Sequence, residues 1–200
     1  MTASETFVAR RLVLAVPSTT AARLLSTVAP ELARAIGSIA SESLVAVHHA
    51  YRRADVAHAP DGFGYLVPAR ERQLQLGTLF SSSSDPTAAP RDQVLLRTLI
   101  GGARHPEVVD FDDARLLDVV AREVGPALGL RSPPVWSHVD RYRAVLPRYE
   151  LGHPERVDAI LSALPPGLDL LGNYLRGIGV NHLVSAARQL ANPTFANAGR

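Results

Sequence analysis

Apolar residues near the start of the chain form a short continuous run that is followed by segments with helical spacing. The run covers 12–16 and ends at Pro17, a pattern typical of a strand buried on both faces. The next residues predict a helix that begins at Thr19 or Thr20, and a second helix is predicted over 31–39. This order of strand, loop and helix indicates a piece of an α/β layer.

The middle of the chain shows a different pattern, in which short strand-like segments are separated by charged or Ser/Pro-rich turns. Consecutive strands with short connections favour an antiparallel sheet. The connection over 81–86 is a loop by composition. Strands are predicted over 43–53, 63–67, 74–80 and 94–100.

The last third of the chain returns to alternating helices and strands. Acidic residues at its start and apolar residues on one face predict a helix over 110–128 that ends near Gly129. The predicted fold is α+β, with a mixed or antiparallel sheet inserted between strand, loop and helix pieces of an α/β layer. The elements that follow are a strand over 135–143, a loop with Pro147, a helix over 154–164, a strand over 168–171, a glycine-rich turn, a helix over 181–191 and a tail over 192–200.

Composition excludes several classes of function. All 21 basic residues are Arg, and the chain also has 19 acidic residues, so the pI of 9.4 reflects no large excess of positive charge. The arginines are scattered along the sequence and form no basic stripe that would bind nucleic acid. The absence of Cys excludes disulfides, thiolate metal sites and cysteine nucleophiles. No segment has the length of a transmembrane helix. We expect a cytoplasmic protein, and peripheral contact with a membrane stays open.

The histidines do not predict a metal site. His48 and His49 are adjacent on a predicted strand and point to opposite faces, so they cannot bind one ion. We identify no catalytic acid or base. The remaining histidines considered as ligands are isolated in the sequence, namely His58, His105, His138 and His153.

A glycine-rich segment, 170–181, lies between a predicted strand and a predicted helix. Its glycines allow the backbone to turn tightly and approach a ligand, and the amides at the helix start can face an electron-rich group. An ordinary strand-to-helix turn is the alternative. The segment is not the GxGxxG fingerprint of dinucleotide binding.

Five motifs in a fixed order resemble the oxygen-dependent protoporphyrinogen or coproporphyrinogen oxidases, which are flavoenzymes of the amine-oxidase-like class. The resemblance spans 10–191. The motifs are Gly62–Pro68, Leu76–Phe80, Gly101–Gly102, Leu146–His153 and the turn that contains Gly172, Gly177 and Gly179.

The resemblance implies a cofactor, FAD, and residues that contact it. Tyr142 takes the place of a Trp that packs on the flavin in some relatives, although a half-buried strand tyrosine is the alternative. His182 stands where the family usually has Asp, which puts the tuning of the flavin in doubt. The segment that would pass the flavin ring, with the dipole of its helix supporting negative charge on reduced flavin, contains Gly177, Ile178, Gly179, Val180 and Asn181.

The resemblance also implies a substrate, a porphyrinogen, and an oxidant, molecular oxygen. Phe63, Leu66 and Leu99 correspond to apolar residues that line the porphyrinogen pocket, with plain core packing as the alternative. The residues do not distinguish protoporphyrinogen from coproporphyrinogen. The implied division is 10–40 as a returning piece of the FAD-binding layer, 41–148 as the substrate-binding domain, 149–191 as a carboxyl-terminal FAD-layer segment and 192–200 as a tail.

Such an oxidase needs a GxGxxG half that this sequence does not contain. A truncated copy, a start assigned too late and a second chain that supplies the missing half are the alternatives, and a homo-oligomer is also open. We expect the isolated chain to bind FAD weakly or not at all. Two other functions stay open, a different amine-oxidase-like flavoprotein such as an isoprenoid desaturase, and a non-catalytic tetrapyrrole-binding remnant.

Overall fold

The computed structural model describes residues 7–191, which belong to two compact units. Unit 1 combines the chain up to Ser41 with the chain from Ala144 onward, and unit 2 is Glu42–Arg143. The second unit is therefore inserted into the first. The functional assignment of these parts stays a prediction.

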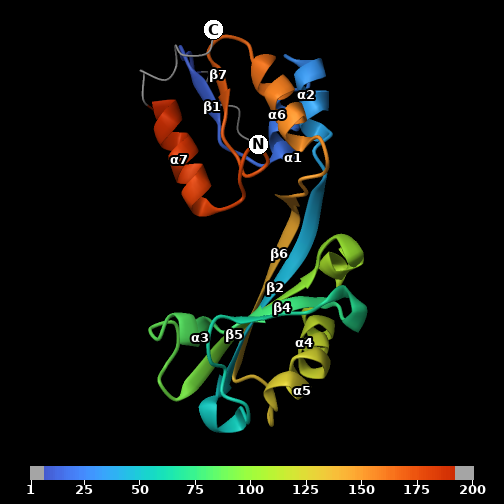
Figure 1. Cartoon of the computed structure of the whole chain (residues 1–200), viewed down its shortest axis with the longest axis vertical. Coiled ribbons are helices and arrows are strands. Elements are labelled where there is room, and N and C mark those ends of the chain that lie inside the picture. Colours follow the sequence, from blue (N-terminus) through green and yellow to red (C-terminus); the bar gives the residue numbers. More distant parts are fainter. Residues whose placement is uncertain (1–6, 192–200) are drawn as a thin grey trace. The chain divides into compact units, whose positions relative to one another are not determined.

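Unit 1 is built around a small parallel pair of strands with helices packed on it (Figure 1). Strand β1 (Leu12–Leu14) pairs with β7 (Leu168–Leu170) over three residues of each strand. The core includes Ile36, Val157 and Tyr174. The helices α1 (Ser18–Leu25), α2 (Pro30–Gly37) and α6 (His153–Ser162) contribute to this core, whereas α7 (Val180–Ala191) has no buried residue.

The prediction that the first apolar run is a strand buried on both faces is wrong. The strand ends at Leu14 rather than residue 16, and only Leu14 is buried. Leu12 is 53% exposed and Val13 is 41% exposed. The reason is that β1 has β7 on one side, while the packed helices reach only Leu14 among its side chains.

Unit 2 contains a five-stranded antiparallel sheet in the order β3-β4-β5-β2-β6. Helices α4 (Asp113–Glu123) and α5 (Gly125–Leu128) pack on one face of it, which forms the core of the unit (Figure 1). Strands β2 and β6 each extend past the boundary of the unit. The strands are β2 (Ser41–Arg52), β3 (Gly64–Leu66), β4 (Gln75–Leu79), β5 (Gln93–Gly101) and β6 (Trp136–Pro147). The predicted α+β class and its antiparallel sheet are confirmed, and the structure adds a separate parallel pair of strands.

Three local predictions need correction. The segment expected to be a loop begins with a helical turn, α3 (Ser81–Ser84), because the amides of Ser83 and Ser84 bond the Phe80 carbonyl. The helix expected over 110–128 is divided into α4 and α5, since Pro126 lacks the amide that would continue it. Strand β6 runs to Pro147, where a loop was expected.

A chain of hydrogen bonds between buried or half-buried side chains crosses the core face of the sheet. His49 Nε2 lies 2.8 Å from Thr98 Oγ1, and Thr98 Oγ1 lies 2.9 Å from Thr78 Oγ1. Thr78 Oγ1 donates to Gln75 Oε1 at 3.2 Å, and the Tyr65 hydroxyl donates to the same oxygen at 3.3 Å. We call this set of residues the polar ladder. It links β2, β5, β4 and β3.

Glu123 at the end of α4 ties the helix to the sheet. Its carboxylate accepts the backbone amides of Leu74 at 3.1 Å and Gln75 at 2.9 Å. The Gln75 side chain donates to the Glu123 carbonyl at 3.2 Å. At the start of the same helix, Asp112 accepts the Arg115 amide at 2.8 Å, so the acidic cluster there is a helix cap as predicted.

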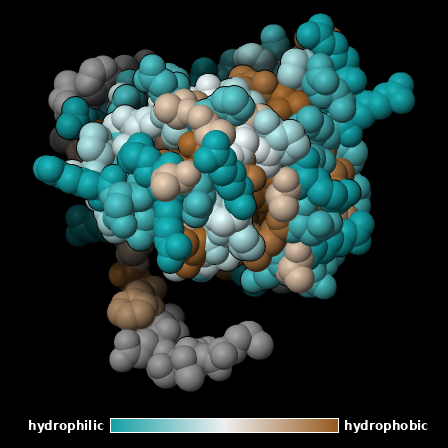
Figure 2. Space-filling model, turned by 90° about the horizontal axis from the view of Figure 1, so that it is seen from below, coloured by the Kyte–Doolittle hydropathy of each residue, from teal (hydrophilic) through white to brown (hydrophobic). Residues whose placement is uncertain are grey.

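The surface seen from below is mostly hydrophilic, with hydrophobic side chains in separate patches (Figure 2). Over residues 7–191, no helix has both the length and the apolar character needed to cross a membrane.

We predict that His49 makes the stability of the protein depend on pH. Burial lowers the pKa of His49 from 6.5 to about 3. Unfolding therefore takes up a proton between these values, and the free energy of unfolding falls as the pH falls through that window, by up to ~1.4 kcal/mol per pH unit from this group. Urea denaturation at pH 6 and pH 4.5 should show a smaller fall for His49→Gln. Replacing the exposed His58 by Gln should leave the parent's fall unchanged, and equal falls in all three proteins would contradict the assignment.

Candidate functional site

The glycine-rich turn of unit 1 follows β7 and leads into α7. None of Gly172, Gly177 and Gly179 has a positive φ, so the turn does not use the left-handed conformation. A Cβ on Gly172 would lie 2.3 Å from Cε1 of Tyr174, and one on Gly177 would lie 2.7 Å from the ring of His182. The absence of a side chain at these positions therefore permits close packing of two rings.

The motif segment Leu146–His153 holds this turn in place. The Tyr149 hydroxyl donates to the Asn173 carbonyl at 2.5 Å, and His153 Nε2 lies 3.0 Å from the Leu175 carbonyl, to which it can only donate. The two rings stack with centroids 4.0 Å apart. Burial raises the pKa of Tyr149, while a hydrogen bond with the Gly177 backbone opposes the rise. Two motifs that are separate in the sequence are thus joined by hydrogen bonds.

The tip of the turn is open. Ile178 is 56% exposed and Val180 is 74% exposed, and Gly179 and Asn181 are also exposed. The amides of His182 and Leu183 bond the Gly179 carbonyl, which begins the helix. The residues expected to pass the flavin ring are therefore accessible to a ligand, and their contact with it stays a prediction.

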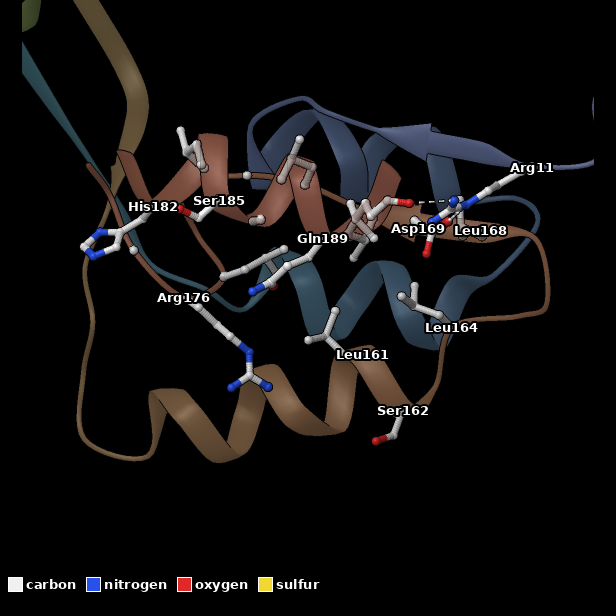
Figure 3. A pocket seen from close by; sticks show the side chains of 18 of the residues that line it. Arg11, Leu161, Ser162, Leu164, Leu168, Asp169, Arg176, His182, Ser185 and Gln189 are labelled. Atoms are coloured by element: carbon white, nitrogen blue, oxygen red, sulfur yellow. Dashed lines mark hydrogen bonds and ion pairs between the residues drawn. The ribbon is translucent and has the colours of Figure 1, made fainter. Parts of the chain in front are cut away.

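A cavity of about 1060 Å³ lies beside the turn, between α7, β7 and α6 (Figure 3). Arg11 and Asp169 form an ion pair at one end, with Nε and Oδ2 2.5 Å apart, and Arg11 also donates to the Leu190 carbonyl at 2.8 Å. Arg176, which pairs with Asp158, lies toward the other end. Helix α7 has no buried side chain, and it lines the cavity with apolar Leu183, Ala186 and Leu190 beside polar residues.

The sheet of unit 2 has a face opposite α4, which we call the open face. Residues directly opposite one another in neighbouring strands share a face. The register places Leu66, Gly77, Leu99 and Ala46 in one row across four strands. They alternate with core residues such as Val45, so the row belongs to the open face.

The row is apolar, and one of its middle positions, Gly77, carries no side chain. Leu66 is 84% exposed, and Leu99 is half-buried. Gly77 lies between them and has no room for a side chain, because a Cβ would lie 2.4 Å from the Tyr65 carbonyl oxygen. Two leucines thus flank a glycine on this face.

A second row on the open face contains Leu79, Arg97 and His48. His48 Nε2 lies 3.2 Å from Oδ2 of Asp140, and His138 Nε2 lies 3.2 Å from Oδ1 of the same carboxylate. His138 is therefore not isolated, because strand pairing brings it to His48. Burial lowers the pKa of His48, and the charge of Arg97 lowers it further.

No group of three or more His, Cys, Asp or Glu residues has the arrangement of a metal site in the part of the chain that the structure describes. His48 and His49 lie on opposite faces, as predicted, since His49 belongs to the polar ladder.

The other predicted site residues do not all lie in one unit. Phe63 lies just before β3 and is 74% exposed. Tyr142 is 43% exposed on β6 and shares the open face with Asp140, two residues earlier. Tyr142, Leu66 and Leu99 are therefore on one sheet face of unit 2, while 177–181 belongs to unit 1. Gly77, Arg97 and His48 were missed, and only knowledge of the strand register would have identified them.

Comparison with known proteins gives a consistent match. The family model described as flavin containing amine oxidoreductase matches residues 1–169. The chloroplastic protoporphyrinogen oxidase of Nicotiana tabacum is 29% identical over 195 residues, which cover 92% of this chain and 36% of that protein. The coproporphyrinogen III oxidase of Propionibacterium freudenreichii subsp. freudenreichii is 33% identical over 183 residues, which cover 90% of this chain and 34% of that protein.

The fold is also found in a solved structure, that of a candidate protoporphyrinogen oxidase from Exiguobacterium sp. 255-15. It superposes with a TM-score of 0.75 at 22% identity and covers 90% of this chain and 40% of that one. The chain thus spans little more than a third of the length of these proteins.

We predict that Gly77→Ala destabilises the protein by ~1–3 kcal/mol, because the added methyl group must displace the backbone of β3. Gly125→Ala is the matched control, since a Cβ there meets nothing within 4 Å. Thermal unfolding followed by circular dichroism measures both. Equal melting temperatures for the two variants would show that the sheet yields easily at Gly77.

We predict that Tyr149→Phe destabilises unit 1 by ~1 kcal/mol, because it removes the hydroxyl that bonds Asn173. Tyr142→Phe is the control, since the Tyr142 hydroxyl has no hydrogen-bond partner within residues 7–191. Hydrogen exchange of the amides over 172–179 should speed up in the first variant only. Unchanged exchange in Tyr149→Phe would mean that the turn is held by other contacts.

Proposed function

Because the chain belongs to the flavin containing amine oxidoreductase family, we propose that it is the substrate-side part of an FAD-dependent porphyrinogen oxidase of haem biosynthesis. The observation that carries the proposal is the open face of unit 2, where Leu66, Gly77 and Leu99 form a low apolar row. Its support is the likeness to proteins named protoporphyrinogen oxidase and coproporphyrinogen III oxidase.

In this proposal the open face binds the macrocycle. Leu66 and Leu99 cover its apolar surface and exclude water, while Gly77 lets the ring approach the sheet. Phe63 adds an exposed aromatic edge beside β3. The role of these residues is to position the substrate, and none of them takes or gives a proton.

The residues of the glycine-rich turn fit one side of a flavin. Ile178 and Gly179 are accessible, and the Tyr149–Asn173 hydrogen bond fixes the backbone that presents them. The first amides of α7 favour negative charge nearby. FAD, when bound, would accept hydrogen from the porphyrinogen in repeated two-electron steps and pass it to molecular oxygen.

The 200 residues contain no GxGxxG turn to hold the pyrophosphate of FAD. We therefore propose that activity needs a dinucleotide-binding part in addition to these residues, with the cavity beside α7 as the region of unit 1 that such a part would cover. The assignments of 10–40 and 149–191 to the FAD layer and of 41–148 to substrate binding belong to the same proposal.

We predict that the purified chain binds FAD weakly or not at all and binds a porphyrin. A titration followed by flavin fluorescence measures the first, and quenching of coproporphyrin fluorescence measures the second. Adding the separately produced part of the Propionibacterium freudenreichii coproporphyrinogen III oxidase that this chain does not match should restore flavin binding and the formation of porphyrin from porphyrinogen in air.

The outcomes of this experiment distinguish between the proposed function and its alternatives. Tight flavin binding by the chain alone would show that FAD binding needs no additional dinucleotide-binding part. Porphyrin binding without any restored oxidation would favour a non-catalytic tetrapyrrole-binding protein. Failure to bind any porphyrin would overturn the proposed function and favour another flavoprotein of the family.

A further inference from the structure

Arg97 occupies an unusual place on the open face. It lies on β5, an interior strand of the sheet, between Leu95 and Leu99 on the same face. Its side chain is exposed, and it forms no ion pair or hydrogen bond with any residue over 7–191. A cation thus stands uncompensated on a surface that is otherwise largely apolar near it.

The arginines on the opposite face of the sheet are paired. Arg141 bonds Asp113 at 2.7 Å, and Arg143 bonds Asp110 at 2.7 Å. These pairs tie β6 to the start of α4 and to the turn before it. Arg97 forms no such ion pair among residues 7–191.

The carboxylate of Asp140, on the same face, already contacts two imidazoles. Asp140 accepts from His48 and His138, both at 3.2 Å, and forms no ion pair with Arg97. Burial and the charge of Arg97 both lower the pKa of His48, while its contact with Asp140 opposes this shift. The free positive charge of this row therefore belongs to Arg97.

The spacing connects this charge with the apolar row. Arg97 and Leu99 are two residues apart on one strand, which places their Cα atoms about 7 Å apart on the same face. A flat ligand centred on Leu66 and Leu99 would bring its periphery to the guanidinium. Porphyrinogens carry propionate carboxylates at their periphery, and the fork of an arginine matches a carboxylate with two parallel hydrogen bonds.

We propose that Arg97 binds a propionate carboxylate of the tetrapyrrole and so fixes how the macrocycle is oriented on the open face. This inference rests on the proposed function, because it takes the open face as the porphyrinogen site. It adds a specificity-determining residue, since a ligand without peripheral carboxylates would leave Arg97 unpaired.

The test is porphyrin binding by the whole 200-residue chain, measured by fluorescence quenching. The probes are coproporphyrin III, which is the stable oxidised form of the porphyrinogen, and its tetramethyl ester, which has no carboxylates. We expect Arg97→Gln to weaken coproporphyrin binding about 10- to 100-fold, as for the loss of a charged hydrogen-bonded pair, and to leave ester binding unchanged. Arg97→Lys should keep part of the affinity.

The matched control is Arg122→Gln. Arg122 lies on α4, pairs with Asp118 at 3.0 Å and is exposed, as Arg97 is, so its replacement should change neither affinity. Because Arg97 is exposed, its replacement should also leave the circular dichroism spectrum and melting temperature unchanged.

The two proposals fail in different ways. If the parent binds coproporphyrin and Arg97→Gln binds it equally well, Arg97 is not the carboxylate partner, and the proposed function stands. If Arg97→Gln loses both probes equally, the arginine shapes the surface rather than recognising a carboxylate. If the parent binds neither probe, the proposed function itself is overturned.

Discussion

The structure of unit 2 depends on the polar ladder that runs from His49 through Thr98 and Thr78 to Gln75. Polar groups in a protein core must be hydrogen-bonded, and a shift of one strand by a single residue would turn each of these side chains to the other face. The ladder therefore fixes the register of β2, β5 and β4. That register in turn decides which residues share the open face, so the proposed substrate surface is determined by bonds on the opposite side of the sheet.

The two faces of the sheet differ in how far other elements cover them. The core face is filled by α4 and α5 and closed by Glu123, which joins the helix to β4. The open face keeps Leu66 and Arg97 exposed. Asp140 on this face contacts two imidazoles, and Arg97 beside the apolar row has no ion-pair partner among residues 7–191.

Much of the fold followed from periodicity, because alternation and apolar runs report directly which side chains are buried. The antiparallel strands were found in this way, while acidic residues indicated the start of the helix that Asp112 caps. Register was not predictable, since pairing between β4 and β5 depends on the whole core rather than on local sequence. Gly77, Arg97 and the contact of His138 with Asp140 therefore could not be found. The apolar run at Leu12 led to a wrong prediction. Hydrophobicity shows which residues a strand could bury, whereas their burial depends on which neighbouring elements cover them.

Strands β2 and β6 are neighbours in the sheet, and both cross the boundary between the units. The insertion thus begins and ends on adjacent, paired strands. An insertion of this kind can be exchanged between relatives by recombination at two points, because the same two paired strands can receive either version. Unit 2 could thus be replaced as a whole through two junctions while the β1–β7 pair of unit 1 stays unchanged.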